Sequence, residues 1–129
     1  MDLLLLSNSR TPGGYLTDYL PAIRELAGAS PRAAFIPFAG VSIAWDDYRK
    51  KVEEALGFKA DHCVEEAELI VVGGGNTFHL LHHVRRKGLL EKIRERVHEG
   101  KASYLGWSAG ANLACPTIRT INVRVPACP

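Results

Sequence analysis

Gly106-Trp107-Ser108-Ala109-Gly110 is the stretch of sequence that decides the fold of this chain. The apolar run at residues 102–105 before it is typical of a buried strand, and residues 109–115 after it suit a helix. A Gly-x-Ser-x-Gly sequence between a strand and a helix predicts a nucleophile elbow, a sharp turn that exposes the serine hydroxyl above the sheet edge. The flanking glycines favour this geometry because a Cβ atom would obstruct the crowded backbone.

Short apolar runs alternate with amphipathic segments along the chain. The apolar runs predict buried strands at residues 3–6, 33–38, 69–72 and 102–105, and the ambiguous stretch 58–64 has room for one short strand. Apolar residues at three- and four-residue spacings predict helices at residues 15–27, 42–56, 77–87 and 89–99. Repeated strand–loop–helix units form right-handed crossovers, so we expect an α/β fold, a three-layer αβα sandwich with a mostly parallel sheet.

Composition narrows the class of protein. The 129 residues fit one domain, and 47% hydrophobic with 23% charged residues is ordinary for a soluble globular chain. A net charge of +2 gives no reason to expect nucleic acid or an anionic membrane as a partner. The three cysteines show no zinc-ligand spacing, so we expect reduced thiols, a cytoplasmic protein and no metal. The opening run of four leucines is too short for a signal sequence or a membrane span.

Gly73-Gly74-Gly75-Asn76 also lies between a predicted strand and a predicted helix, and it allows three interpretations. The first is a phosphate cradle at a helix N-terminus, as in a flavodoxin-like nucleotide binder, although GxGxxG spacing and a P-loop lysine are absent. The second is a purely structural tight turn. The third is an oxyanion hole, in which the backbone N–H groups of Gly75 and Ala109 bind an acyl oxygen.

A nucleophilic serine requires a base, and the histidines are the first residues to consider. His79, His82 and His83 lie on the predicted helix after the glycine turn, where His79 and His83 are one turn apart and share a face. Solvated helix histidines are the simplest interpretation of all three. His62 and His98 are expected at the surface. None of the five follows Ser108, where hydrolases with this turn place their base.

Several segments together resemble peptidase E, the α-aspartyl dipeptidase family of serine peptidases. The matching segments are residues 3–9, 36–40, 45–46 with Tyr48, 72–78 and 106–120. The resemblance implies a class I glutamine amidotransferase-like αβα sandwich. It also implies hydrolysis of dipeptides with an N-terminal aspartate, a small peptide substrate, without metal or cofactor.

Carried onto this sequence, the resemblance assigns Ser108 as the nucleophile. It assigns the backbone N–H groups of Gly75 and Ala109 as the oxyanion hole, and we take Asn76 as a further substrate-binding candidate. The chain is shorter than the family between Gly57 and Glu68.

The family pattern ends at Thr120. We therefore expect residues 1–120 to form an incomplete peptidase E-like domain, truncated at its C-terminal side, and residues 121–129 to form a divergent tail without regular structure. The family's catalytic histidine, its acidic partner and its substrate-reading arginine lie further on and have no counterpart here. Weak or absent activity of this chain follows. The alternative is a non-catalytic form that associates with a partner or a full-length relative through an exposed sheet edge.

Overall fold

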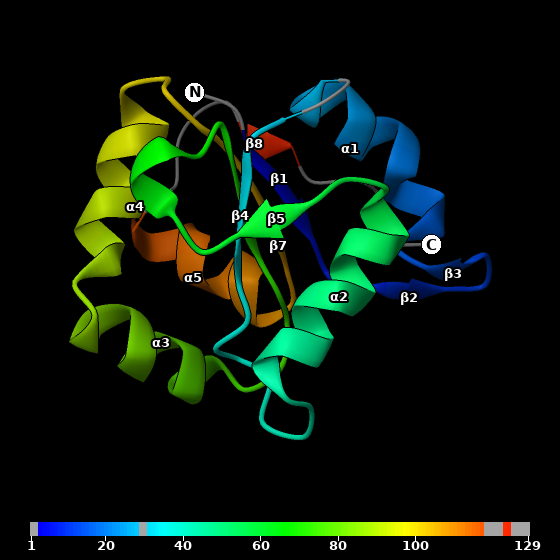
Figure 1. The fold of residues 1–129 in the computed structure, drawn as a ribbon, viewed down its shortest axis with the longest axis horizontal. Helices are drawn as coiled ribbons and strands as arrows, with labels where there is room; N and C mark the ends of the chain where they lie inside the picture. The colour runs from blue at the N-terminus through cyan, green and yellow to red at the C-terminus, as the bar shows by residue number, and fades with distance from the viewer. Residues whose placement is uncertain (1–2, 29–30, 118–122, 125–129) are drawn as a thin grey trace.

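A parallel sheet runs through the centre of the computed structural model, which describes residues 3–28, 31–117 and 123–124 (Figure 1). Over these residues the sheet has six strands in the order β5-β4-β6-β7-β1-β8, and every neighbouring pair is parallel. The strands are β1 (Leu3–Leu6), β4 (Ala33–Ile36), β5 (Ala60–Asp61), β6 (Leu69–Val72), β7 (Ser103–Trp107) and β8 (Val123–Arg124). The parallel sheet predicted from the sequence is confirmed.

Helices cover both faces of the sheet. The helices are α1 (Leu20–Ala27), α2 (Trp45–Leu56), α3 (Thr77–Arg86), α4 (Leu89–His98) and α5 (Ala109–Thr117), with short 3-10 turns η1 (Thr17–Tyr19) and η2 (Val64–Glu66). α1 and α2 pack on one face, and α3, α4 and α5 pack on the other (Figure 1). The result is the expected three-layer αβα sandwich.

The core explains why the strand sequences are apolar throughout. Side chains alternate along each strand, so Leu4 and Phe35 face α1 and α2, whereas Leu3 and Ile36 face α3, α4 and α5. Because helices cover both faces, every residue of β1, β4 and β6 is buried. Continuous apolar runs are therefore what this sheet requires.

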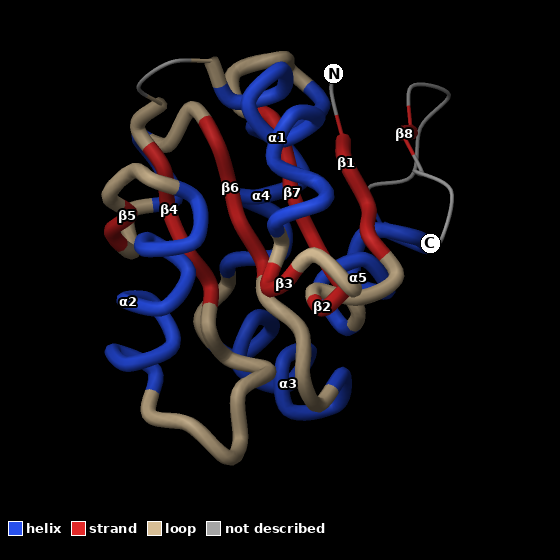
Figure 2. Tube along the Cα trace, turned by 90° about the vertical axis from the view of Figure 1, so that its right-hand side faces the viewer, coloured by secondary structure: helices blue, strands red, loops and turns tan. Residues whose placement is uncertain are grey.

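Two predicted helices begin later than their periodicity suggests. Residues 15–27 were expected to be helical, but α1 starts at Leu20, after Leu16 in a left-handed conformation with φ 60°. An antiparallel hairpin of β2 (Arg10–Thr11) and β3 (Gly14–Tyr15) occupies the preceding residues, beside the lower end of β1 (Figure 2). The second helix, expected from residue 42, starts at Trp45 because Ala44 has extended backbone angles.

The chain after residue 120 departs from expectation at one point. Residues 121–129 were expected to lack regular structure, but Val123–Arg124 forms β8 and pairs with Leu3 and Leu4 of β1. An edge strand exposes unpaired backbone N–H and C=O groups, and any extended segment within reach can satisfy them. That expectation is wrong for β8, and the remaining residues of the stretch lie outside the described ones.

Candidate active site

Ser108 lies on the turn between β7 and α5. Its φ of 53° places it in the left-handed region, which is uncommon for a residue with a side chain. The backbone N–H of Ser108 donates a hydrogen bond to the carbonyl oxygen of Leu6 at 3.0 Å. The Oγ hydroxyl donates to the carbonyl oxygen of Ser7 at 3.2 Å. The serine is therefore held at the carboxyl ends of two adjacent parallel strands, β1 and β7.

The two glycines of this turn are required by close backbone approaches. A Cβ atom on Gly110 would overlap the carbonyl oxygen of Val72 in β6. A Cβ atom on Gly106 would lie 2.7 Å from the carbonyl carbon and oxygen of Gly110. The buried hydroxyl of Tyr104 donates to that same Gly110 oxygen at 2.7 Å. The start of α5 is thus pressed against the sheet, as the sequence predicted from the glycines.

The glycine turn between β6 and α3 lies directly against the serine. A Cβ atom on Gly74 would lie 2.8 Å from the Cβ atom of Ser108. Gly75 has φ 139°, and a Cβ atom there would overlap the carbonyl oxygen of Ala39. The backbone N–H of Asn76 donates to that Ala39 oxygen at 2.8 Å. Two turns that are far apart in sequence therefore meet at one sheet edge.

Asn76 has a structural role at the start of α3. It is the N-cap residue, and its Oδ1 accepts a hydrogen bond from the backbone N–H of His79 at 2.9 Å. The capping bond occupies the amide oxygen of the side chain. The Nδ2 group is the part of Asn76 that is left for a ligand.

Tyr48 of α2 fixes the orientation of the glycine turn. Its hydroxyl donates to the carbonyl oxygen of Gly74 at 3.0 Å, and its ring packs edge-on against Phe35 at 5.0 Å. Burial raises the pKa of Tyr48, so the hydroxyl keeps its proton. In a trans peptide the C=O and N–H groups point in opposite directions, so a carbonyl held by Tyr48 directs the N–H of Gly75 away from α2.

Two backbone donors near Ser108 are open. Within the described residues the N–H groups of Gly75 and Ala109 form no hydrogen bond. Ala109 is the first residue of α5, and the first N–H groups of a helix have no partner inside it. Open donors of this kind bind an oxygen atom that carries negative charge.

A cavity of about 370 Å³ lies beside Ser108 and Gly75. Ser108, Gly75 and Asn76 line it, as do residues that sequence reasoning did not single out for the site: Tyr15, Tyr48, Trp107, Arg10 and Lys51. Ala109 follows Ser108 directly and is buried behind it. No His, Asp or Glu is among the lining residues that the structure describes. The cavity wall therefore carries the Ser108 hydroxyl, the Gly75 backbone and two cations.

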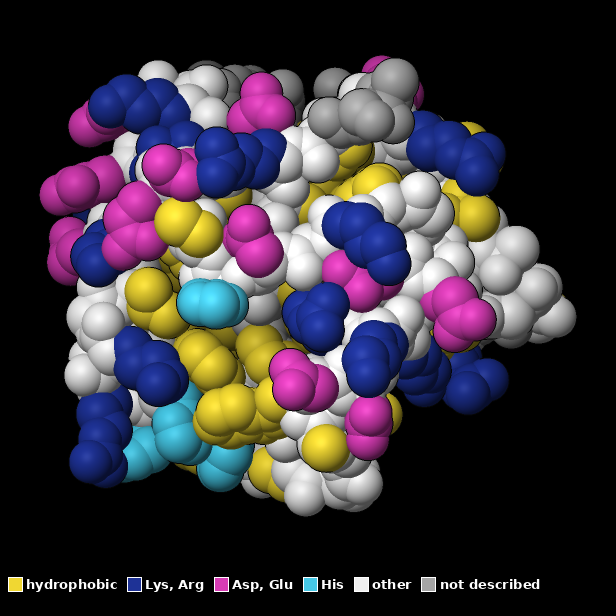
Figure 3. Space-filling model, in the orientation of Figure 1, with side chains coloured by type: hydrophobic (Ala, Val, Ile, Leu, Met, Phe, Trp, Pro, Cys, Tyr) yellow, Lys and Arg dark blue, Asp and Glu magenta, His cyan; other side chains and the backbone are white. Residues whose placement is uncertain are grey.

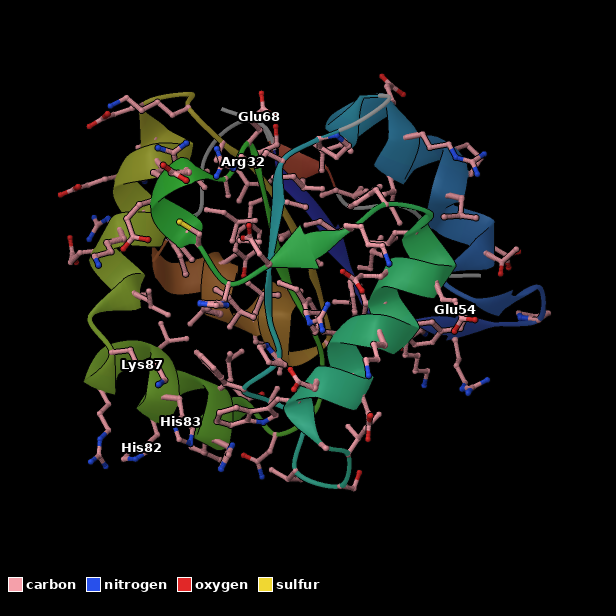
Figure 4. All side chains as sticks on the ribbon, viewed as in Figure 1. Arg32, Glu54, Glu68, His82, His83 and Lys87 are labelled. Atoms are coloured by element: carbon pink, nitrogen blue, oxygen red, sulfur yellow. The ribbon has the colours of Figure 1, made fainter. Side chains whose placement is uncertain are left out.

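All five histidines lie in the described part of the chain, and none lines this cavity. The rings of His79 and His83 are 4.6 Å apart, so the two residues share a helix face as predicted. His79 Nδ1 forms a hydrogen bond with the carbonyl oxygen of Phe38 at 2.6 Å, and His83 packs against Trp45. Desolvation and the nearby His79, His82 and Lys87 lower the pKa of His83 (Figure 4). Figure 3 shows histidines beside apolar surface on the face of the molecule turned to the viewer.

Among the described residues, no three His, Cys, Asp or Glu side chains are grouped as metal ligands. No helix in this part of the chain is long and apolar enough to cross a membrane.

A family model described as Peptidase family S51 matches residues 3–127. Peptidase E from Salmonella newport (strain SL254) is 50% identical over 135 residues, which cover 95% of this chain and 58% of the relative. Peptidase E from Salmonella heidelberg (strain SL476) is 51% identical with the same coverage. The chain thus spans 58% of the length of these curated relatives.

The fold has a solved counterpart. A crystal structure of a candidate peptidase E protein from Listeria monocytogenes EGD-e superimposes with a TM-score of 0.67 at 28% identity. The match covers 88% of this chain and 62% of the other.

The extent of these matches bears on two sequence expectations. An alignment of 135 residues is longer than this 129-residue chain, so the Salmonella relatives contain residues without a counterpart here. The family model runs to residue 127, past the expected boundary at residue 120, and the boundary itself stays a prediction. Because the family model covers almost the whole chain and the relatives are half identical to it, this chain belongs to peptidase family S51.

Proposed function

We propose that Ser108 is the nucleophile of a serine-type dipeptidase and that its turn is a nucleophile elbow. One observation carries the proposal: a serine in a left-handed turn lines a cavity next to two open backbone donors. The N–H groups of Gly75 and Ala109 are the proposed oxyanion hole. Membership of a peptidase family and relatives named peptidase E support the same reaction class.

The proposed chemistry begins with attack of Ser108 Oγ on the carbonyl carbon of a peptide bond. The carbonyl oxygen becomes an oxyanion, which the two backbone N–H groups stabilise by hydrogen bonding. The hydroxyl proton passes to a base, and the same proton later leaves with the departing amine. The Ser7 carbonyl that accepts the hydroxyl in this structure is too weak a base for that step, so the side chain must turn from Ser7 to react.

The proposed substrate is a dipeptide with an N-terminal aspartate. This follows from the resemblance of the 106–120 and 72–78 segments to the α-aspartyl dipeptidases. The cavity volume of about 370 Å³ suits a small peptide. The Nδ2 group of Asn76 is proposed to donate a hydrogen bond to this peptide.

We further propose that these 129 residues alone hydrolyse such dipeptides weakly or not at all. No His, Asp or Glu among the described residues lines the cavity, so Ser108 has no base there. In subtilisin, loss of the catalytic histidine alone lowers kcat by about 2 × 10⁶. A similar loss would leave only what the oxyanion hole and binding contribute.

The test supplies the rest of the enzyme from a relative. A chimera joins residues 3–117 of this chain to the matching C-terminal part of Salmonella peptidase E. Release of leucine from Asp-Leu is then measured for the chimera, the chimera with Ser108→Ala, and this chain alone. We expect the chimera to hydrolyse Asp-Leu, its Ser108→Ala variant to lose at least about 10⁴-fold of the rate, and the chain alone to stay near that level.

Each arm has a result that contradicts it. A chimera that folds by circular dichroism and retains activity after Ser108→Ala contradicts the nucleophile assignment. Hydrolysis of Asp-Leu by the chain alone at the rate of Salmonella peptidase E contradicts the proposed weakness.

A second proposed role is non-catalytic association through the sheet edge. β8 pairs with Leu3 and Leu4, and within the described residues Leu5 and Leu6 have no strand partner on that side. An open parallel edge is a site for pairing with another chain. Sedimentation of a single monomeric species over a wide range of protein concentrations, alone and with a full-length relative, would remove this candidate.

A further inference from the structure

Two cations line the Ser108 cavity. Arg10 comes from β2 and Lys51 from α2, and both line the cavity with Ser108. Lys51 Nζ lies 4.3 Å from the centre of the Tyr15 ring, and Arg10 Cζ lies 5.9 Å from the same centre. Two positive groups that are far apart in sequence therefore lie within about 6 Å of the same ring.

Neither cation has a counter-ion among the residues that the structure describes. Among the described residues, six ion pairs are formed, and Arg10 and Lys51 take part in none of them. Arg49 on the same helix differs, because it pairs with Glu53 at 3.0 Å. No carboxylate lines the described part of the cavity wall.

Tyr15 does not supply the missing negative charge. Burial, followed by the neighbouring Tyr48, raises the pKa of Tyr15, so its hydroxyl stays neutral at physiological pH. The cavity wall thus has two positive charges and no negative one among the described residues. Like charges held together in a concave site favour entry of an anion.

We propose that Arg10 and Lys51 bind a carboxylate of the peptide that Ser108 attacks. The proposal rests on the proposed dipeptidase function and adds to it the groups that recognise the substrate. A planar guanidinium binds a carboxylate through two parallel hydrogen bonds, and an ammonium adds a compact positive charge. A dipeptide with an N-terminal aspartate has two carboxylates, one on its side chain and one at its C-terminus, and the chemistry of recognition is the same for both.

Binding, rather than turnover, tests this assignment. The chain with Ser108→Ala is titrated with Asp-Leu, Asn-Leu and Asp-Leu amide, and dissociation constants are taken from backbone amide shifts in NMR spectra. Lys51→Met and Arg10→Met are each added to this background. Lys50→Met is the matched control, since Lys50 is the preceding exposed lysine of α2 and does not line the Ser108 cavity.

We expect Lys51→Met and Arg10→Met each to weaken Asp-Leu binding about tenfold, because both cations are exposed at the cavity and partly screened. Lys50→Met should change it less than twofold. If the two cations bind the side-chain carboxylate, Asn-Leu should bind weakly, and neither substitution should change its dissociation constant. A C-terminal carboxylate predicts the same behaviour for Asp-Leu amide instead.

Unchanged Asp-Leu affinity in both Lys51→Met and Arg10→Met would overturn the proposal, as would the absence of Asp-Leu binding at millimolar concentration. If a variant fails to fold, the protein with both Arg10 and Lys51 still tests the proposal. Asp-Leu must then shift the amides of Arg10, Tyr15 and Lys51, and its affinity must fall as salt rises from 50 to 500 mM. Retention of activity by the Ser108→Ala chimera, with this binding intact, would reject the nucleophile and leave the carboxylate site standing.

Discussion

The two strand-to-helix turns at Ser108 and at Gly75 lie side by side but distribute backbone strain differently. In the β7–α5 turn the left-handed residue is Ser108 itself, with φ 53°, and the glycines provide space. In the β6–α3 turn the left-handed conformation falls on Gly75, with φ 139°, and Asn76 caps the helix with its side chain. One turn thus presents a side-chain hydroxyl, and the other presents bare backbone.

In each turn a tyrosine hydroxyl also donates a hydrogen bond to a backbone carbonyl oxygen. Tyr104 donates to the carbonyl oxygen of Gly110 at 2.7 Å, and Tyr48 donates to that of Gly74 at 3.0 Å. The difference lies in what the bond controls. The Tyr104 bond fixes a helix against the sheet, whereas the Tyr48 bond sets the direction of the peptide between Gly74 and Gly75. The strained conformation of Ser108 and the positive φ of Gly75 together place the serine hydroxyl beside open backbone donors.

The largest expected effect is on the packed turn. Gly110→Ala should lower the free energy of unfolding by about 3 kcal/mol, because the new Cβ overlaps the Val72 carbonyl and neither the helix nor the sheet can move aside. Urea denaturation measures it. Asn112→Ala, on an exposed position of the same helix, is the control and should change stability by less than about 0.5 kcal/mol. Equal effects of the two substitutions would contradict the close packing of this turn.

The glycine turn should respond less, since Gly75 and Asn76 are exposed and can shift. Gly75→Ala should lower the free energy of unfolding by about 2 kcal/mol, through the positive φ and the contact with Ala39. Gly100→Ala is the control, because Gly100 has φ 73° with open space around it, and should lose about 1 kcal/mol from φ alone. A loss no larger than that of Gly100→Ala would mean that the contact with Ala39 adds nothing to the destabilisation.

Tyr48→Phe separates orientation from packing. The ring and its contact with Phe35 remain, but the Gly74 carbonyl loses its donor, which should lower the free energy of unfolding by about 1–2 kcal/mol. The amide signal of Gly75 should shift in the NMR spectrum and exchange faster with solvent. Tyr104→Phe is the counterpart in the other turn, and it should lower stability while leaving the Gly75 amide in place. An unmoved Gly75 amide in Tyr48→Phe would show that the hydroxyl does not orient this peptide.

What the sequence predicts about these turns depends on how local the cause is. The Ser108 turn was predictable because the strand, the glycines and the helix are contiguous. The bond from Ser108 Oγ to Ser7 joins residues 101 positions apart, and the bond from Tyr48 to Gly74 joins residues 26 apart. In the sequence Tyr48 is one apolar helix position among others, and only the packing of α2 beside the glycine turn gives its hydroxyl a partner. In the sequence, Arg10 and Lys51 likewise look like ordinary surface cations, and only the fold places both near the Tyr15 ring.

The smallest expected effect concerns the strain at Ser108 itself. Ser108→Ala and Ser108→Gly both remove the hydroxyl and its bond to Ser7, but only glycine adopts φ 53° without strain. Ser108→Gly should therefore be more stable than Ser108→Ala by about 1 kcal/mol in urea denaturation. At Asn112, inside α5, the order should reverse, because glycine there is less favourable than alanine by about 1 kcal/mol. If glycine is no better than alanine at position 108, the serine turn is not strained, and the contrast with the Gly75 turn reduces to which atoms each exposes.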